Sequence, residues 1–244
     1  MAEAVDVWIV SYERDFSWLR LCARGVAKYF TGWRTLHIAL PHSAPDPGIC
    51  LPFVRHDDAG LHDGYICQQV TKLRAYRETD APWIAFLDSD HVAFKPVDVS
   101  FYFDAELAII PYRHWDEIEK LPGCGPGVTR EACRWRPIVA KAIGHDPNVF
   151  TLEYLPFIVH RDTLIETCGT VERVHGCKLE EFAQCQPWRE FSEFNMIGNE
   201  AWENTPKRYS FRHVDGTIDY RFRGFSPYQG VRPEDRAWCE EVLK

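Results

Sequence analysis

A run of five apolar residues, Trp83 to Leu87, ends abruptly in Asp88, Ser89 and Asp90. An apolar run without polar alternation indicates a strand that is covered on both faces. Such a strand belongs to a sheet that lies between two layers of helices. Two adjacent carboxylates are costly to desolvate unless a cation accompanies them. We therefore expect a buried sheet that presents paired acidic side chains at one edge.

The N-terminal part of the chain alternates strand patterns with helix patterns. Strands are predicted at 5–10, at 35–40 and, more weakly because of Pro52, at 49–54, whereas helices are predicted at 16–30 and 65–77. This alternation predicts an α/β fold with a Rossmann-type, mostly parallel sheet and helices on both faces. Ligands of such sheets bind beyond the carboxyl ends of the strands, where residues 88–90 are expected to lie.

The pattern after residue 98 is less regular. It predicts strands at 107–110 and 155–160, helices at 131–142 and 178–184, a short helix that begins at Arg161, and a Gly/Pro loop at 121–127. The chain has 244 residues, a length that one α/β domain commonly reaches. We therefore expect a single domain with an irregular C-terminal part.

The triplet Asp88-Ser89-Asp90 offers two carboxylates to a hard cation. Such a site suits Mg²⁺ or Mn²⁺ and leaves coordination positions open for phosphate oxygens. A cation held there neutralises charge on a departing diphosphate. The alternative is a solvated turn, which the same triplet often forms in other chains. The buried strand before it favours the metal site.

Two segments resemble known enzymes. Residues 65–73 together with 83–90 resemble GT-A-fold glycosyltransferases, and Phe191-Ser192-Glu193-Phe194-Asn195 with Gly198 is similar to a motif in a bacterial and phage branch of glycosyltransferases. The resemblance implies a nucleotide-sugar-binding half at 1–98 and an acceptor-binding half at 99–244. It also implies Mn²⁺ or Mg²⁺ as cofactor and a nucleotide diphosphate sugar, most simply a UDP-sugar, as donor.

The resemblance assigns roles to individual residues. Asp88 and Asp90 are expected to bind the metal, with a late histidine completing the site. His213 is our choice for that histidine, with His160 and His175 as competitors. Donor contacts are expected from Ser11, Tyr12, Asp58, Gln69, Lys72, Asp88 and Ser89.

Several of these residues also have simpler interpretations. Asp58, after the third strand, either binds ribose hydroxyls or belongs to a solvated turn. Lys72 is predicted on the helix face opposite Val70 and Leu73, which also fits a solvent-exposed side chain. Each residue therefore has a structural alternative to a donor contact.

Glu193 and Asp90 are the predicted catalytic residues. Glu193 lies in an aromatic-rich segment, where burial would raise its pKa and suit it to be the base that takes the acceptor proton. It could equally cap a helix after Ser192. Trp188 and Phe191 either offer ring faces to a sugar or belong to the core.

The segment from Lys207 to Arg232 differs in charge from the rest of the chain. It carries a net charge of +4, although the whole chain carries −8, and aromatic residues such as Tyr209, Phe222 and Tyr228 lie between its basic residues. This pattern suits phosphate contact and base stacking, so modified DNA, such as a flipped hydroxymethylated base, is one expected acceptor. The acidic total charge favours the other, a glycan.

Two other function classes fit parts of the sequence. Residues 87–92 also resemble the first motif of haloacid dehalogenase-like phosphatases, in which Asp88 would be a nucleophile. That family normally has this motif on its first strand, whereas about eighty residues precede it here. A sugar-nucleotide-binding module without catalysis is the third possibility.

Features that would direct the chain out of the cytoplasm are not evident in the sequence. No apolar window reaches the roughly 18 residues that a membrane span needs, and the first residues do not resemble a signal peptide. Nine cysteines without a C-x-x-C pair indicate reduced thiols. We therefore expect a cytoplasmic protein of a bacterium or a phage-infected cell.

Overall fold

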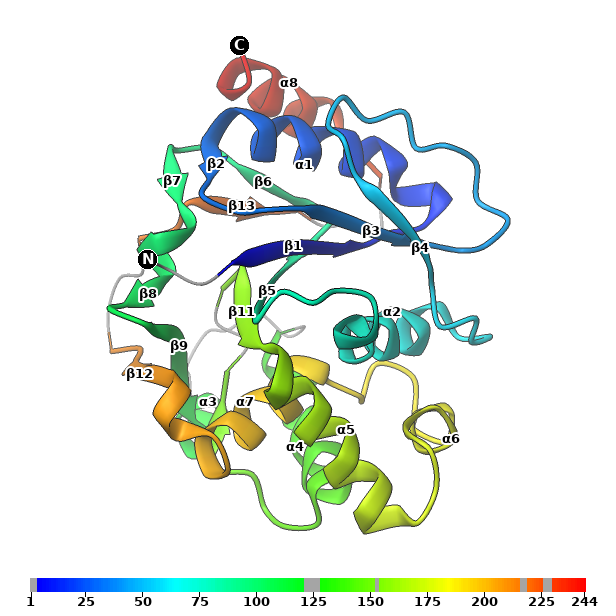
Figure 1. Ribbon diagram of the computed structural model, residues 1–244, viewed down its shortest axis with the longest axis vertical. Helices are drawn as coiled ribbons and strands as arrows, with labels where there is room; N and C mark the ends of the chain where they lie inside the picture. Colours follow the sequence, from blue (N-terminus) through cyan, green and yellow to red (C-terminus); the bar gives the residue numbers. More distant parts are fainter. Residues whose placement is uncertain (1–3, 121–127, 152–153, 216–218, 226–229) are drawn as a thin grey trace.

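A five-stranded sheet forms the centre of the molecule (Figure 1). The structure is a computed structural model that describes residues 4–120, 128–151, 154–215, 219–225 and 230–244. The strand order is β11-β5-β1-β3-β4. The strands are β1 (Val5–Val10), β3 (Leu36–Leu40), β4 (Val54–Asp57), β5 (Trp83–Asp88) and β11 (Phe157–His160). All pairs are parallel except β11 with β5. The predicted mostly parallel sheet is confirmed.

Helices cover both faces of this sheet, as predicted (Figure 1). On one face lie α1 (Phe16–Tyr29) and α8 (Pro233–Val242), and on the other lie α2 (Gly64–Leu73), α4 (Val128–Ile143), α5 (Arg161–His175), α6 (Leu179–Gln184) and α7 (Glu193–Glu203). None of the described helices has the length and apolar character that crossing a bilayer requires.

The part predicted to be irregular is organised around a second sheet. Its long strand β9 (Leu107–His114) pairs with β8 (Phe103–Asp104), β10 (Val149–Phe150) and β12 (Tyr209–His213). The described residues also form two small ribbons: β2 (Phe30–Thr31) with β7 (Val97–Asp98), and β6 (His91–Ala93) with β13 (Phe222–Gly224). Helix α3 (Trp115–Lys120) follows β9, and 3-10 turns occupy Glu13–Asp15, Ala75–Arg77, Val99–Tyr102 and Pro206–Arg208.

Some predicted boundaries are wrong. The weak strand at 49–54 begins only at Val54, since Pro52 has no N–H for the ladder. The helix predicted at 65–77 ends at Leu73 and continues as a separate 3-10 turn. The helix that begins at Arg161 has 15 residues and is not short. The loop predicted at 121–127 lies outside the described residues.

The motif at 191–198 spans the residues before α7 and its first turns, and α7 packs closely against β10. The amide oxygen of Asn195 accepts a bond from Thr151 N at 2.9 Å, and Asn199 Oδ1 accepts one from Val149 N at 3.1 Å. A Cβ on Gly198 would lie 2.1 Å from Thr151 Oγ1. Because only glycine permits this approach, part of the motif serves packing and orients the first turn of α7.

A buried polar network ties β1 to β3. Asp6 is fully buried and accepts bonds from Arg34 Nε at 2.9 Å and Nη2 at 2.8 Å, and its Oδ2 lies 3.0 Å from His37 Nε2. Burial raises the pKa of Asp6, but His37, Arg34 and Thr79 outweigh it and hold that pKa well below its usual range. The carboxylate therefore stays charged inside the sheet.

The network continues through a pair of imidazoles to edge strand β4. His37 Nδ1 lies 2.9 Å from His56 Nε2, and His56 Nδ1 lies 3.3 Å from Glu78 Oε2. The contact between the two rings needs one N–H donor and one bare ring nitrogen. Protonation of both rings would turn two N–H groups toward each other.

We expect this pair to make folding sensitive to acid. Burial and His37 lower the pKa of His56, against Glu78 and Asp57, which raise it. Below about pH 6.5 the unfolded chain therefore binds a proton that the folded chain resists, and the free energy of unfolding falls. His56→Gln should reduce the slope of that free energy between pH 7.5 and 5.5, as measured by urea unfolding.

His42 provides the matched control for this measurement. Its side chain is 90% exposed and pairs with Asp57. His42→Gln should leave the slope of the wild type unchanged. A His56→Gln protein with an unaltered slope would show that the histidine pair does not govern the response to acid.

Candidate functional site

The central strands β1 and β5 end side by side. Val10 is in register with Asp88, and a cavity of about 550 Å³ opens beyond the two carboxyl ends. Its volume lies within the range of small-molecule sites. The walls come from the ends of β1 and β5, the 3-10 turn before α1, the start of α2 and one turn before α7. Its lining residues are Val10, Tyr12, Arg14, Asp15, His62, Asp63, Gly64, Tyr65, Gln68, Asp88, Ser89, Asp90 and Trp188.

Asp88, Asp90 and His91 form a group that could hold a cation. One ligand atom from each residue lies within 4.8 Å of the others. His91 Nδ1 lies 2.9 Å from Asp90 Oδ1. Lys72 Nζ and Gln68 Nε2 donate to Oδ1 of Asp88, at 2.6 Å and 3.4 Å. These two bonds leave the second oxygen of Asp88 for a metal ion, so two carboxylates and an imidazole fit Mn²⁺ or Mg²⁺.

Lys72 is a buried cation beside this group. Its side chain is only 2% exposed, and its Nζ donates to Asp88 Oδ1 at 2.6 Å and to Glu193 Oε1 at 2.9 Å. The ammonium also lies 4.5 Å from the ring centroid of Phe194. The solvent-exposed alternative for Lys72 is therefore wrong, because two carboxylates compensate the burial of its charge.

The pKa shifts at the site follow from burial and from these charges. Burial raises the pKa of Asp88, but Lys72 and His91 outweigh it and hold that pKa below its usual value. Burial lowers the pKa of Lys72, but Asp88 and Glu193 outweigh burial and hold that pKa above its usual value. The pKa of His91 is raised against the effect of burial by Asp90 and Asp88. Asp88 and Lys72 are therefore charged near neutral pH, whereas a metal ion would bind the neutral form of His91.

Glu193, the predicted base, lies behind Lys72. It is 4% exposed, and it is not among the residues that line the cavity. Burial raises its pKa, and the charge of Lys72 opposes the rise. Its own N–H donates to Gln69 Oε1 at 3.1 Å, so Gln69 is turned toward α7 while Gln68 lines the cavity. Glu193 and Gln69 together hold the start of α7 against α2.

Of the other predicted donor-binding residues, some line the cavity and some do not. Tyr12 and Ser89 line the cavity, and the hydroxyl of Tyr12 donates to Gly64 O at 2.6 Å. Ser11 is buried and is not among the lining residues; its N–H continues the sheet by donating to Ala39 O at 3.0 Å. Asp58 is also outside the lining and accepts a bond from Gly60 N at 2.9 Å, which stabilises a turn.

The predicted metal histidine, His213, is not part of the cation group. It ends β12, and its Nε2 lies 2.8 Å from Glu117 Oε2. Its competitors are also engaged elsewhere: His160 Nδ1 accepts a bond from Asp162 N at 3.2 Å, and His175 lies 2.8 Å from Lys141 O. The structure places His91 beside the two aspartates instead.

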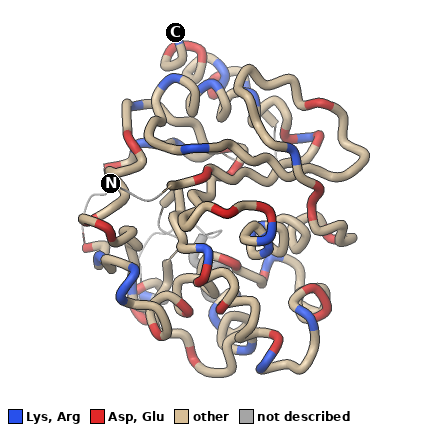
Figure 2. Tube along the Cα trace, in the orientation of Figure 1, with Lys and Arg blue, Asp and Glu red and all other residues tan. Residues whose placement is uncertain are grey.

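Basic residues of the segment 207–232 contact acidic ones within the chain. Arg208 pairs with Asp162 at 2.9 Å and Arg212 with Asp104 at 3.3 Å. Arg221 pairs with Asp219, and Arg232 with Asp235. Figure 2 shows basic and acidic positions interspersed around β12. Tyr228, one of the predicted stacking residues, lies outside the described residues.

Sequence reasoning missed several residues of the site. His91 directly follows Asp90, so its position was a usable signal, but the resemblance directed attention to a later histidine. Asp15 and Asp63 were harder to find, because each lies at a helix start where an acidic residue is ordinary. Asp63 does cap α2, accepting bonds from Tyr65 N at 2.9 Å and Ile66 N at 3.1 Å.

Comparisons with known proteins inform the fold. No protein-family model matches the chain, and no curated protein matches it by sequence. An active-site mutant of LgtC is 12% identical over 97% of this chain and 93% of its own, with a TM-score of 0.52. A 2-C-methyl-D-erythritol 4-phosphate cytidylyltransferase from Thermus thermophilus is 16% identical over 97% of this chain and 96% of its own, with a TM-score of 0.47.

Proposed function

We propose that this chain is a glycosyltransferase that depends on a divalent cation and takes its sugar from a nucleotide diphosphate donor. The observation that carries the proposal is the group of Asp88, Asp90 and His91 at the end of β5, whose two aspartates line the cavity. The structural similarity to LgtC supports the fold that such a reaction uses. Residues 1–98 then supply most of the donor site, and 99–244 most of the acceptor site.

The cation group fits the task of holding a diphosphate. A bound Mn²⁺ or Mg²⁺ would neutralise the charge on the leaving nucleoside diphosphate. Asp88, Asp90 and His91 would hold that ion, and Ser89 lies between them on the cavity wall. Lys72 fixes Asp88 in place through its 2.6 Å bond, and Glu193 in turn fixes Lys72. We assign Glu193 this positioning role.

The transfer also needs an acceptor for one proton. The bond between the anomeric carbon and the donor diphosphate breaks, a bond to the acceptor oxygen forms, and the hydroxyl proton leaves. Outside the cation group, the cavity carboxylates are Asp15 and Asp63, and Asp63 caps α2. Burial raises the pKa of Asp15, although Arg14 lowers it, which suits this carboxylate to accept the proton.

The first test is donor consumption across a panel of nucleotide sugars with Mn²⁺, Mg²⁺ or EDTA. We expect one donor to release its nucleoside diphosphate with a cation present and to be inert with EDTA. Titration of UDP and GDP with Mn²⁺ by calorimetry provides a readout that needs no turnover. The proposal would be overturned if no donor were bound and none were consumed with either cation.

A further inference from the structure

Trp188 is exposed at the wall of the same cavity. It is 62% exposed, more than any other described large hydrophobic side chain, whereas Phe191 nearby is fully buried. Exposing an indole to water gives up the free energy that its burial would provide. Exposed aromatic surface at a cavity often marks a binding site. Of the two aromatic residues considered for a sugar face, only Trp188 has its ring accessible.

The turn that carries Trp188 is held in a strained conformation. Arg189 has a φ of 62°, in the left-handed region that an arginine rarely adopts. Glu190 N donates to Pro187 O at 3.1 Å, and Trp135 Nε1 donates to Arg189 O at 3.0 Å. The Arg189 guanidinium lies 5.2 Å from the centroid of the indole. These contacts fix the backbone that presents the ring, which lowers the entropy cost of stacking a ligand on it.

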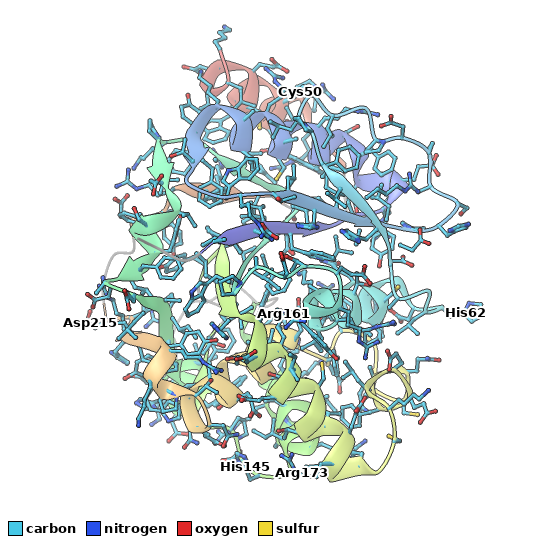
Figure 3. The ribbon with its side chains drawn as sticks, viewed as in Figure 1. Cys50, His62, His145, Arg161, Arg173 and Asp215 are labelled. Atoms are coloured by element: carbon cyan, nitrogen blue, oxygen red, sulfur yellow. The ribbon has the colours of Figure 1, made fainter. Side chains whose placement is uncertain are left out.

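The charge of the cavity selects the kind of ring that can stack there. Its lining includes four carboxylates, Asp15, Asp63, Asp88 and Asp90, and one arginine, Arg14. A divalent cation and a donor diphosphate would roughly cancel each other, so the cavity stays acidic with both bound. A polyanion such as DNA is repelled by this surface, whereas a neutral hydroxylated ring is not. His62, another lining residue, points outward from the segment before α2 (Figure 3).

We infer that Trp188 is the platform for a neutral carbohydrate acceptor, with one ring face of the sugar stacked on the indole. This inference rests on the proposed function and chooses the glycan over modified DNA. The other ring that could use the platform is the nucleobase of the donor. Loss of the indole would weaken binding of the glycoside in the first case and binding of the nucleotide in the second. One set of variants therefore distinguishes them.

The test compares Trp188→Ala and Trp188→Phe with Phe101→Ala. Phe101 is the matched control, since it is 44% exposed and lies under the guanidinium of Arg221 at 4.9 Å, outside the cavity lining. Methyl glycosides of common hexoses serve as probes in saturation-transfer NMR. Trp188→Ala should weaken binding of the recognised glycoside roughly ten- to a hundredfold, with partial recovery in Trp188→Phe. Calorimetric binding of UDP or GDP with Mn²⁺ should stay unchanged.

Each outcome decides the inference. If Trp188→Ala weakens nucleotide binding and leaves glycoside binding intact, the platform serves the nucleobase and the inference is overturned. If it alters neither, or if only DNA carrying hydroxymethylated bases is bound through Trp188, the inference is also overturned. Failure of the proposed function would look different, because no donor would be consumed even by a protein that binds glycosides through Trp188.

Discussion

Replacing Asp90 with asparagine is expected to lower kcat by roughly a hundred- to a thousandfold. The substitution preserves the shape of the side chain and removes the charge that would hold the cation with Asp88 and His91. The fold should survive, since the backbone carbonyl of Asp90, which accepts a bond from Phe225 N at 3.1 Å, is unchanged. Asp90 is a cleaner choice than Asp88, whose loss would also remove one of the two carboxylates that pair with Lys72.

Steady-state rates of donor consumption measured over a range of Mn²⁺ concentrations test this expectation. Weaker binding of the cation should raise the Mn²⁺ concentration that gives half-maximal activity. Asp57→Asn is the control, because Asp57 pairs with the exposed His42 and does not line the cavity. An Asp90→Asn enzyme with the kcat and Mn²⁺ dependence of the wild type would remove the basis of the proposed function.

The central sheet could be predicted because its signals are local. The apolar run at 83–87 and its neighbours are buried on both faces, so their composition alone reveals them. The strands around β9 could not be predicted as a sheet, since β9 and β12 pair residues that lie about a hundred positions apart, such as Ala108 with Tyr209. A helix after Ser192 was only one of two interpretations of Glu193, because the aromatic segment before α7 resembles a loop in the sequence alone.

The residues of the site also divide into those that the local sequence predicts and those that depend on distant contacts. Asp88 and Asp90 were identified from the strand that precedes them, and the structure places both on the cavity wall. The burial of Lys72 could not be predicted, because Glu193, which helps compensate its charge, is 121 residues away. A helical pattern assigns lysine to solvent unless the partner is known. Distant ion pairs of this kind are what single-sequence reasoning lacks.

Replacing Lys72 with methionine is expected to destabilise the fold by about 3–5 kcal/mol. The side chain keeps its bulk, but Asp88 and the buried Glu193 lose the cation between them. Both carboxylates should then accept protons more readily, because the charge of Lys72 lowers the pKa of each. The loss should therefore be smaller at pH 5 than at pH 7.5, as the folded protein takes up protons that relieve the repulsion.

Urea unfolding of three variants separates the buried charge from the packing of the chain. Adding Glu193→Gln to Lys72→Met removes one of the two unpaired carboxylates, so the double variant should be more stable than Lys72→Met alone. Lys95→Met is the control, since Lys95 pairs with Asp219 at 3.6 Å and both side chains are 49% exposed. It should cost less than about 1 kcal/mol. Equal losses in Lys72→Met and Lys95→Met would mean that the Asp88–Lys72–Glu193 contact does not hold α2, β5 and α7 together, and the positioning role of Glu193 would fall with it.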